Sequence, residues 1–191
     1  MWNIPNILTM LRIVLIPVFV VVFYIEAPWA PYVAAAVFGA AALTDWLDGY
    51  LARLWEQTSP LGAFLDPVAD KLMVAVALVL LVQYDPRTLL ALPAMVIIGR
   101  EITVSALREW MAEIGARAKV AVSMTGKIKT TAQMISIVLL ILHDTVFGPW
   151  VYGLGLILLY VAAVLTLWSM VLYLRAAWPS LSGQVDVEGR G

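Results

Sequence analysis

The sequence contains no cysteine and only one histidine among its 191 residues. Disulfide bonds, thiolate nucleophiles and ordinary Cys/His zinc sites are therefore excluded. Charged residues are also scarce, at 13% of the chain, and the formal net charge at pH 7 is −1. This balance gives no electrostatic reason to expect nucleic acid as a partner. Any metal ion bound by this chain would have oxygen ligands.

Apolar residues take the place of the missing charge. They make up 63% of the sequence, and the mean hydropathy is +0.93, whereas soluble domains are about half apolar and a quarter charged. Six apolar runs each approach the roughly 20 residues that cross a hydrocarbon core as helix. They span residues 7–25, 32–51, 64–82, 89–110, 128–142 and 152–173. The sequence therefore predicts an all-α membrane protein, a six-transmembrane-helix bundle, in one domain (1–178) with a polar, disordered tail (179–191).

Basic residues gather in the connections on one side of such a six-span arrangement. They are Arg53, Arg108, Arg117, Lys119, Lys127, Lys129, Arg175 and Arg190. The connections on the other side hold Arg87 beside three acids, Glu26, Asp85 and Asp144. The positive-inside rule then predicts that both termini are cytoplasmic. The first apolar run lacks a basic leader and a small-residue cleavage site, so we expect a retained helix rather than a signal peptide.

Four aspartates lie in or beside the second and third apolar runs. Asp45 and Asp48 are three residues apart and Asp66 and Asp70 are four apart, so each pair projects from one face of its helix. Helices joined by a short connection pack antiparallel, which predicts that all four carboxylates meet. Carboxylates so close together repel one another unless a cation lies among them. Oxygen ligation favours Mg²⁺ or Mn²⁺ over zinc.

Three residues beside these aspartates suit a nucleotide diphosphate. Gly49 and Ala52 are small enough for a ligand to approach the backbone, and Arg53 offers a planar, multiply donating cation for phosphate. Taken alone, the small residues are equally compatible with close helix packing.

Together these residues form the pattern Asp45-x2-Asp48-Gly49-x2-Ala52-Arg53-x8-Gly62-x3-Asp66-x3-Asp70, which resembles the signature of the CDP-alcohol phosphotransferase family. The resemblance implies six membrane helices, usually in a homodimer, and transfer of a phosphatidyl group from CDP-diacylglycerol to an alcohol with release of CMP. It also implies that Asp45, Asp48 and Asp66 bind two metal ions, and that Asp70 completes the second metal site and takes the proton from the acceptor hydroxyl. The residues expected at CDP-diacylglycerol are Gly49, Ala52, Arg53, Ser59, Gly62 and Thr9.

Basic residues outside this pattern suggest which alcohol is the acceptor. Arg100 and Arg108 lie in the fourth apolar run, and Lys127 and Lys129 open the fifth. A desolvated cluster of arginine and lysine binds a phosphate far more strongly than a neutral polyol, so the predicted acceptor is anionic. Two other interpretations stay open: the lysines can be topology signals, and Arg100 can be neutralised by Glu101 or by another helix.

The resemblance extends beyond the acidic pattern. Segments 3–12, 99–110 and 126–133 resemble bacterial members of the family that use sn-glycerol 3-phosphate, and the likeness continues to about Trp178. It implies that the product is phosphatidylglycerophosphate, that Arg12 lies near the acceptor phosphate, and that the enzyme works at the cytoplasmic face of a bacterial inner membrane.

Two alternatives remain. The same chemistry with inositol phosphate or serine as acceptor is the nearer one. A cation transporter is the other, because buried acids also mark ion paths. Between Lys129 and Arg175, however, the sequence has one charged residue, Asp144, and one histidine, His143. Both fall on the side away from the four aspartates. Charges confined to one side favour an interfacial enzyme.

Overall fold

A computed structural model describes residues 4–55, 60–114, 124–143, 145 and 149–181 of the chain. The described residues form six helices: α1 (Ile4–Phe23), α2 (Ala30–Trp55), α3 (Pro60–Tyr84), α4 (Thr88–Glu113), α5 (Met124–Ile141) and α6 (Pro149–Leu181). Each helix covers one of the six predicted apolar runs, so the all-α prediction is confirmed.

The helix ends differ from those of the predicted apolar runs by a few residues. Helix α3 begins at Pro60, before the third apolar run, because proline is well suited to the first turn of a helix, where its missing N–H is not needed. Helix α6 runs on to Leu181, beyond the predicted start of the polar tail at residue 179. The rest of that tail, residues 182–191, lies outside the described part of the chain.

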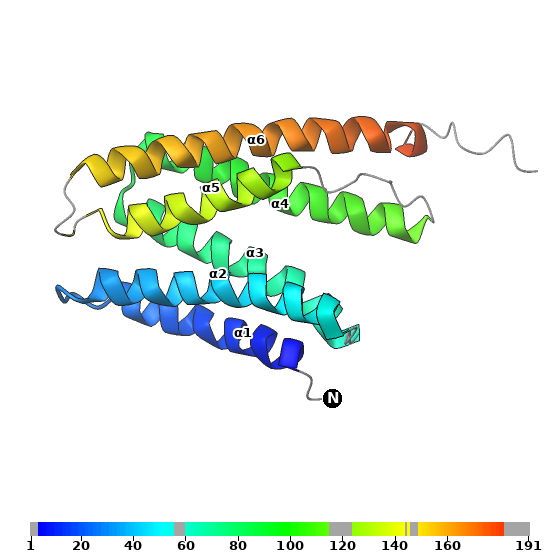
Figure 1. The fold of residues 1–191 in the computed structure, drawn as a ribbon. Helices are drawn as coiled ribbons and strands as arrows, with labels where there is room; N and C mark the ends of the chain where they lie inside the picture. The colour runs from blue at the N-terminus through cyan, green and yellow to red at the C-terminus, as the bar shows by residue number, and fades with distance from the viewer. Residues whose placement is uncertain (1–3, 56–59, 115–123, 144, 146–148, 182–191) are drawn as a thin grey trace, which may run out of the picture.

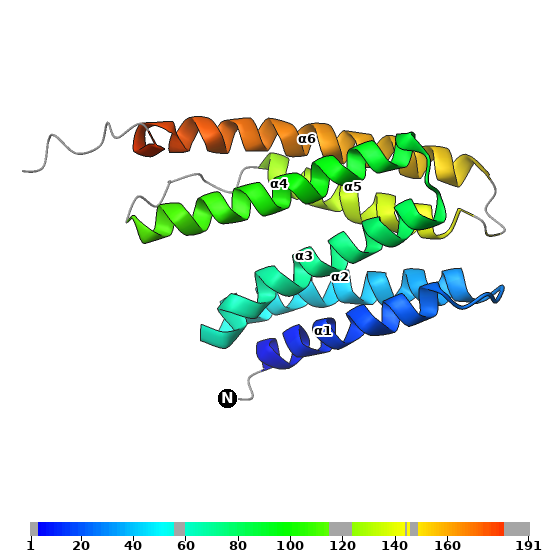
Figure 2. The same ribbon diagram turned by 180° about the vertical axis from the view of Figure 1, so that it is seen from behind.

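The helices form two groups that run side by side. Helix α1 packs on α2 and α3, and α6 packs on α4 and α5, as both views show (Figures 1 and 2). The start of α1, the end of α2, the start of α3, the end of α4, the start of α5 and the end of α6 all lie at one end of the bundle. We call it the acidic end because Asp45, Asp48, Asp66 and Asp70 lie on the parts of α2 and α3 nearest to it.

The interior of the bundle is apolar, and so is much of its outside. Phe19 of α1 packs against Phe38 of α2, with ring centroids 6.0 Å apart, in a buried cluster that extends to α3–α6. Large side chains such as Val21, Ile157 and Val164 are more than 60% exposed, as expected of a surface that faces lipid.

Two helices are long and apolar enough to cross a membrane, α4 over Thr88–Glu113 and α6 over Pro149–Arg175. Shorter apolar stretches lie in α1, α2 and α5, at Ile7–Phe23, Ala30–Thr44 and Ile128–Ile141. These findings support a membrane protein, while the count of six spans stays a prediction.

A group of polar contacts lies at the end of the bundle opposite the acidic end. We call this group, made of Asp85, Arg87 and Tyr152, the polar clasp. Arg87 donates to both carboxylate oxygens of Asp85, at 2.6 and 2.8 Å, and the Tyr152 hydroxyl donates to the same carboxylate at 2.7 Å. The hydrogen bond from Arg87, helped by that from Tyr152, lowers the pKa of Asp85 to about 2. His143 packs between the rings of Tyr84 and Tyr152. The clasp thus fastens the α3–α4 turn to α6, and His143 belongs to this packing.

Helices α5 and α6 approach each other closely at Gly155. The Ser136 hydroxyl on α5 donates to the Gly155 carbonyl oxygen at 2.7 Å. A Cβ atom built on Gly155 would lie 3.0 Å from Leu140 Cγ and 3.2 Å from Leu139 Cβ, whereas one on Gly153 would have nothing within 4 Å. Gly155 is therefore a packing residue, and Gly153 is not.

We expect Gly155→Ala to lower the thermal unfolding midpoint of the detergent-purified protein, because the added methyl group overpacks the α5–α6 contact at a cost of about 1–3 kcal/mol. Gly153→Ala is the matched control and should leave the midpoint unchanged or raise it, since alanine is the better helix former. Equal midpoints for the two variants would contradict the close approach at Gly155.

Candidate active site

The backbone places the predicted metal ligands on two helices at the acidic end. Asp45 and Asp48 lie in α2, and Asp66 and Asp70 lie one turn apart in α3. Because the backbone is helical at both pairs, the two aspartates of each pair lie on the same face of their helix, as the spacing predicts. The side chains of Asp45 and Asp48 lie outside the described residues, so the meeting of all four carboxylates stays a prediction. The same holds for the expected ligand residues Gly49, Ala52 and Arg53 in α2, for Lys127 in α5, and for Ser59 as a whole.

Asp66 is held by a residue from the first helix. The Thr9 hydroxyl donates a hydrogen bond to Asp66 Oδ1, and Thr9 itself is fully buried. Gly62 is also buried, one turn before Asp66 on α3. Thr9, which the sequence placed at CDP-diacylglycerol, thus fixes the orientation of a predicted metal ligand.

Asp70 lies among residues from four helices. It lines a small cavity of about 10 Å³ together with Arg12 of α1, Phe38 of α2 and Met134 of α5. Arg12 is only 1% exposed, so a guanidinium is buried close to the predicted base. Asp70 also acts electrostatically on Lys129 of α5. The neighbouring lysine, Lys71, donates instead to the Ser105 hydroxyl on α4. Asp70 therefore lies near two cations, Arg12 of α1 and Lys129 of α5.

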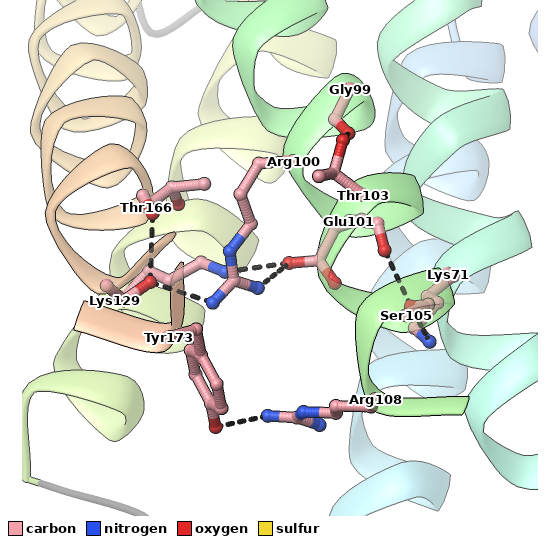
Figure 3. A network of polar contacts seen from close by, with 11 residues as sticks. Lys71, Gly99, Arg100, Glu101, Thr103, Ser105, Arg108, Lys129, Thr166 and Tyr173 are labelled. Carbon is pink, nitrogen blue, oxygen red and sulfur yellow. Dashed lines mark hydrogen bonds and ion pairs between the residues drawn. The ribbon is translucent and has the colours of Figure 1, made fainter. Parts of the chain in front are cut away.

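A single carboxylate joins two of the predicted phosphate-binding cations (Figure 3). Glu101 Oε1 accepts from Arg100 Nη1 at 2.8 Å and from Lys129 Nζ at 2.7 Å. Arg100 is 8% exposed and Lys129 is 4% exposed, so both charges are largely removed from water. The interpretation in which Glu101 neutralises Arg100 is confirmed as a contact. Glu101 balances one of these two positive charges, and the carboxylate of Asp70 also attracts Lys129.

Helix α6 adds two partners that the sequence analysis did not identify. Arg100 Nη2 donates to the Ser169 hydroxyl at 2.7 Å. Arg108 donates to the Tyr173 hydroxyl, and its guanidinium carbon lies 4.8 Å from the centre of the same ring. Arg100 Nε is buried with no hydrogen-bond partner among the described residues. The available signal was the spacing of Thr166, Ser169 and Tyr173 within an otherwise apolar helix.

This basic cluster, made of Arg100, Arg108 and Lys129 with Glu101, suits an anion. Two of the cations share one carboxylate, Arg100 Nε has no hydrogen-bond partner among the described residues, and Arg108 is exposed and held by a neutral tyrosine. Charge-assisted hydrogen bonds from arginine to phosphate are among the strongest in proteins when water is excluded. The cluster therefore has the chemistry of a phosphate site beside Asp70.

A larger cavity lies elsewhere and gathers none of the predicted site residues. Its volume is about 480 Å³, and its lining includes Phe23, Leu80, Tyr84 and His143 near the polar clasp. The walls are mainly apolar, and the lining residues come from the end of α1, the start of α2, the end of α3 and the end of α5, away from Asp70.

Comparison with known proteins agrees with this arrangement. The family model described as CDP-alcohol phosphatidyltransferase matches residues 2–168. The chain belongs to this family. Proteins named CDP-diacylglycerol–glycerol-3-phosphate 3-phosphatidyltransferase from Escherichia coli (strain K12) and Shigella flexneri serotype 5b (strain 8401) are each 53% identical to it over 183 residues. Each alignment covers 96% of this chain and 99% of the relative. The resemblance found in the acidic pattern is thus confirmed over nearly the whole chain.

The ion pairs of Glu101 can be tested through stability alone. Glu101→Gln leaves Arg100 and Lys129 buried without an anion, which should cost about 3 kcal/mol and lower the unfolding midpoint in detergent. Adding Lys129→Gln should recover part of the loss, because one of the two stranded charges is then removed. Glu109→Gln, which changes an exposed acid on the same helix, is the control and should have no effect. An unchanged midpoint in Glu101→Gln would show that the carboxylate does not join the two cations.

Proposed function

We propose that this chain transfers the phosphatidyl group of CDP-diacylglycerol to sn-glycerol 3-phosphate, giving phosphatidylglycerophosphate and CMP. The observation that carries the proposal is its 53% identity, over almost the full length of both chains, to relatives named for this reaction. The basic cluster supports a phosphorylated acceptor, because a phosphate brings more negative charge to these cations than the single carboxylate of zwitterionic serine, and a neutral polyol brings none.

Divalent metal ions fit the acidic end by the chemistry of its donors. Asp66 and Asp70 project from the same face of α3, the Thr9 hydroxyl orients Asp66, and Asp45 and Asp48 lie on α2 at the same end. We propose that these four aspartates hold two Mg²⁺ or Mn²⁺ ions. Ions bound there would neutralise the diphosphate and stabilise the charge that develops during in-line displacement at phosphorus.

The remaining steps follow from the residues around Asp70. The acceptor hydroxyl oxygen forms a new bond to the phosphatidyl phosphorus, and the bond from that phosphorus to the bridging diphosphate oxygen breaks, which releases CMP. The hydroxyl proton passes to the Asp70 carboxylate, which acts as the general base. Arg100, Arg108 and Lys129, with Lys127, bind the acceptor phosphate and so place the hydroxyl near Asp70. Buried Arg12, in the same small cavity as Asp70, contributes further positive charge.

We also propose the setting in which this reaction takes place. Helices α4 and α6 are membrane-capable, and the apolar surface of the other helices fits a six-span protein of a bacterial inner membrane. The basic residues then place both termini and the acidic end on the cytoplasmic side, where a soluble phosphorylated acceptor has access. Family likeness favours a homodimer.

The experiment that tests the proposal measures CMP release by the detergent-purified protein with CDP-diacylglycerol and Mg²⁺. Glycerol 3-phosphate, serine, inositol, inositol phosphate and no acceptor are compared, and the lipid product is identified by mass spectrometry. We expect release only with glycerol 3-phosphate. Release with another acceptor would keep the family chemistry and overturn the assigned substrate. No release with any acceptor, from folded protein, would favour the transporter interpretation.

The role of Asp70 makes a separate prediction. Asp70→Asn should bind CDP-diacylglycerol nearly as the parent does, because the amide occupies the same space. It should lose turnover by at least about a hundredfold, because an amide cannot accept the proton. Binding is measured by isothermal titration and turnover by CMP release. Activity within tenfold of the parent would mean that another group is the base.

A further inference from the structure

Helix α6 carries one polar stripe on an otherwise apolar surface. Thr166, Ser169 and Tyr173 are three and four residues apart, so they lie on the same face. No charged residue occurs in α6 before Arg175. Polar groups within a membrane-capable helix are costly, so they usually mark function. The stripe therefore needs an explanation beyond helix packing.

The stripe faces the arginines of α4. Arg100 and Arg108 are eight residues apart, close to two helical turns, and thus share a face of α4. Ser169 contacts Arg100, and Tyr173 contacts Arg108 one turn further along α6. Figure 3 shows the Tyr173 ring between the two guanidinium groups. Its centre is 4.8 Å from the guanidinium carbon of Arg108 and 6.0 Å from that of Arg100.

The partners of these cations differ in kind. Glu101 is an anion and offsets the charge of the buried pair Arg100 and Lys129. Tyr173 is neutral: its hydroxyl accepts a hydrogen bond from Arg108, and its ring attracts the guanidinium through the negative face of the π system. Tyr173 therefore holds the Arg108 side chain in place without neutralising it, so its full positive charge stays available for an anion. A free arginine side chain loses conformational freedom when a ligand immobilises it, whereas Arg108 is already held by Tyr173 before the ligand arrives.

We propose that Tyr173 is a positioning residue for the acceptor phosphate, which holds Arg108 against α6 and flanks Arg100 so that both guanidiniums point to one place. The inference rests on the proposed function, because it takes the basic cluster as the acceptor site. It follows that Tyr173 sets the KM for the phosphorylated acceptor and has little influence on the lipid nucleotide, whose diphosphate belongs to the acidic end.

The test compares Tyr173→Phe and Tyr173→Leu with the parent by steady-state CMP release. Tyr173→Leu loses both hydroxyl and ring and should raise the KM for glycerol 3-phosphate by about tenfold. Tyr173→Phe keeps the ring and should raise it by less, about threefold. In both variants the KM for CDP-diacylglycerol should stay within twofold. Trp168→Leu, an exposed aromatic on the same helix, is the control and should leave both KM values unchanged.

A double-mutant cycle separates positioning from general loosening of the bundle. If Tyr173 acts through Arg108, adding Tyr173→Phe to Arg108→Ala should not raise the acceptor KM further. Additive effects, equal rises in both KM values, or an unchanged acceptor KM in Tyr173→Leu would each overturn the inference. If Tyr173→Leu does not fold, Tyr173→Phe and the cycle decide the outcome. Failure of the parent to use any phosphorylated acceptor would instead overturn the proposed function.

Discussion

Burying charge among apolar helices is costly, and the structure depends on the way that Glu101 offsets this cost. Its carboxylate forms ion pairs with two buried cations. Breaking a buried ion pair by removing one partner typically costs several kcal/mol. Glu101 binds a cation from its own helix and another from α5, while Ser169 and Tyr173 tie the α4 arginines to α6. Three helices are thereby held in register at the acidic end. The positions of Arg100, Arg108 and Lys129 depend on this arrangement.

The two ends of the bundle are stabilised by different means. Away from the acidic end, Asp85, Arg87 and Tyr152 close a turn, and none of the residues predicted for catalysis lies there. At the acidic end, the polar groups are of the kinds that bind metal ions and phosphate. Thr9 orients one of them, Asp66, through a hydrogen bond. A lipid nucleotide and a soluble acceptor can both reach such an end when it lies at a membrane surface. The bundle thus carries its predicted acids on α2 and α3 and the cations of the basic cluster on α4 and α5.

The sequence predicts well what depends on local spacing. Six helices follow from the length of the apolar runs, and the shared face of Asp66 and Asp70 follows from their separation of four residues. Contacts between distant segments could not be predicted in this way. Thr9 and Asp66 are 57 positions apart, and Arg108 and Tyr173 are 65 apart, so only the packing of α1 on α3 and of α4 on α6 brings them together. Polar residues in α6 were the overlooked signal, because this span was identified from the length of its apolar run alone.

The proposed mechanism requires the basic cluster to hold the acceptor phosphate beside metal ions bound at the acidic end. Phosphorus-31 relaxation of glycerol 3-phosphate, measured with Mn²⁺ and the detergent-purified protein, shows whether it does. We expect strong relaxation of the bound phosphate by protein-bound Mn²⁺, which is lost in Asp66→Asn although the acceptor still binds. If the phosphorus of the bound acceptor relaxes no faster with Mn²⁺ than with Mg²⁺, the phosphate and the metal lie in separate parts of the molecule and the mechanism is wrong.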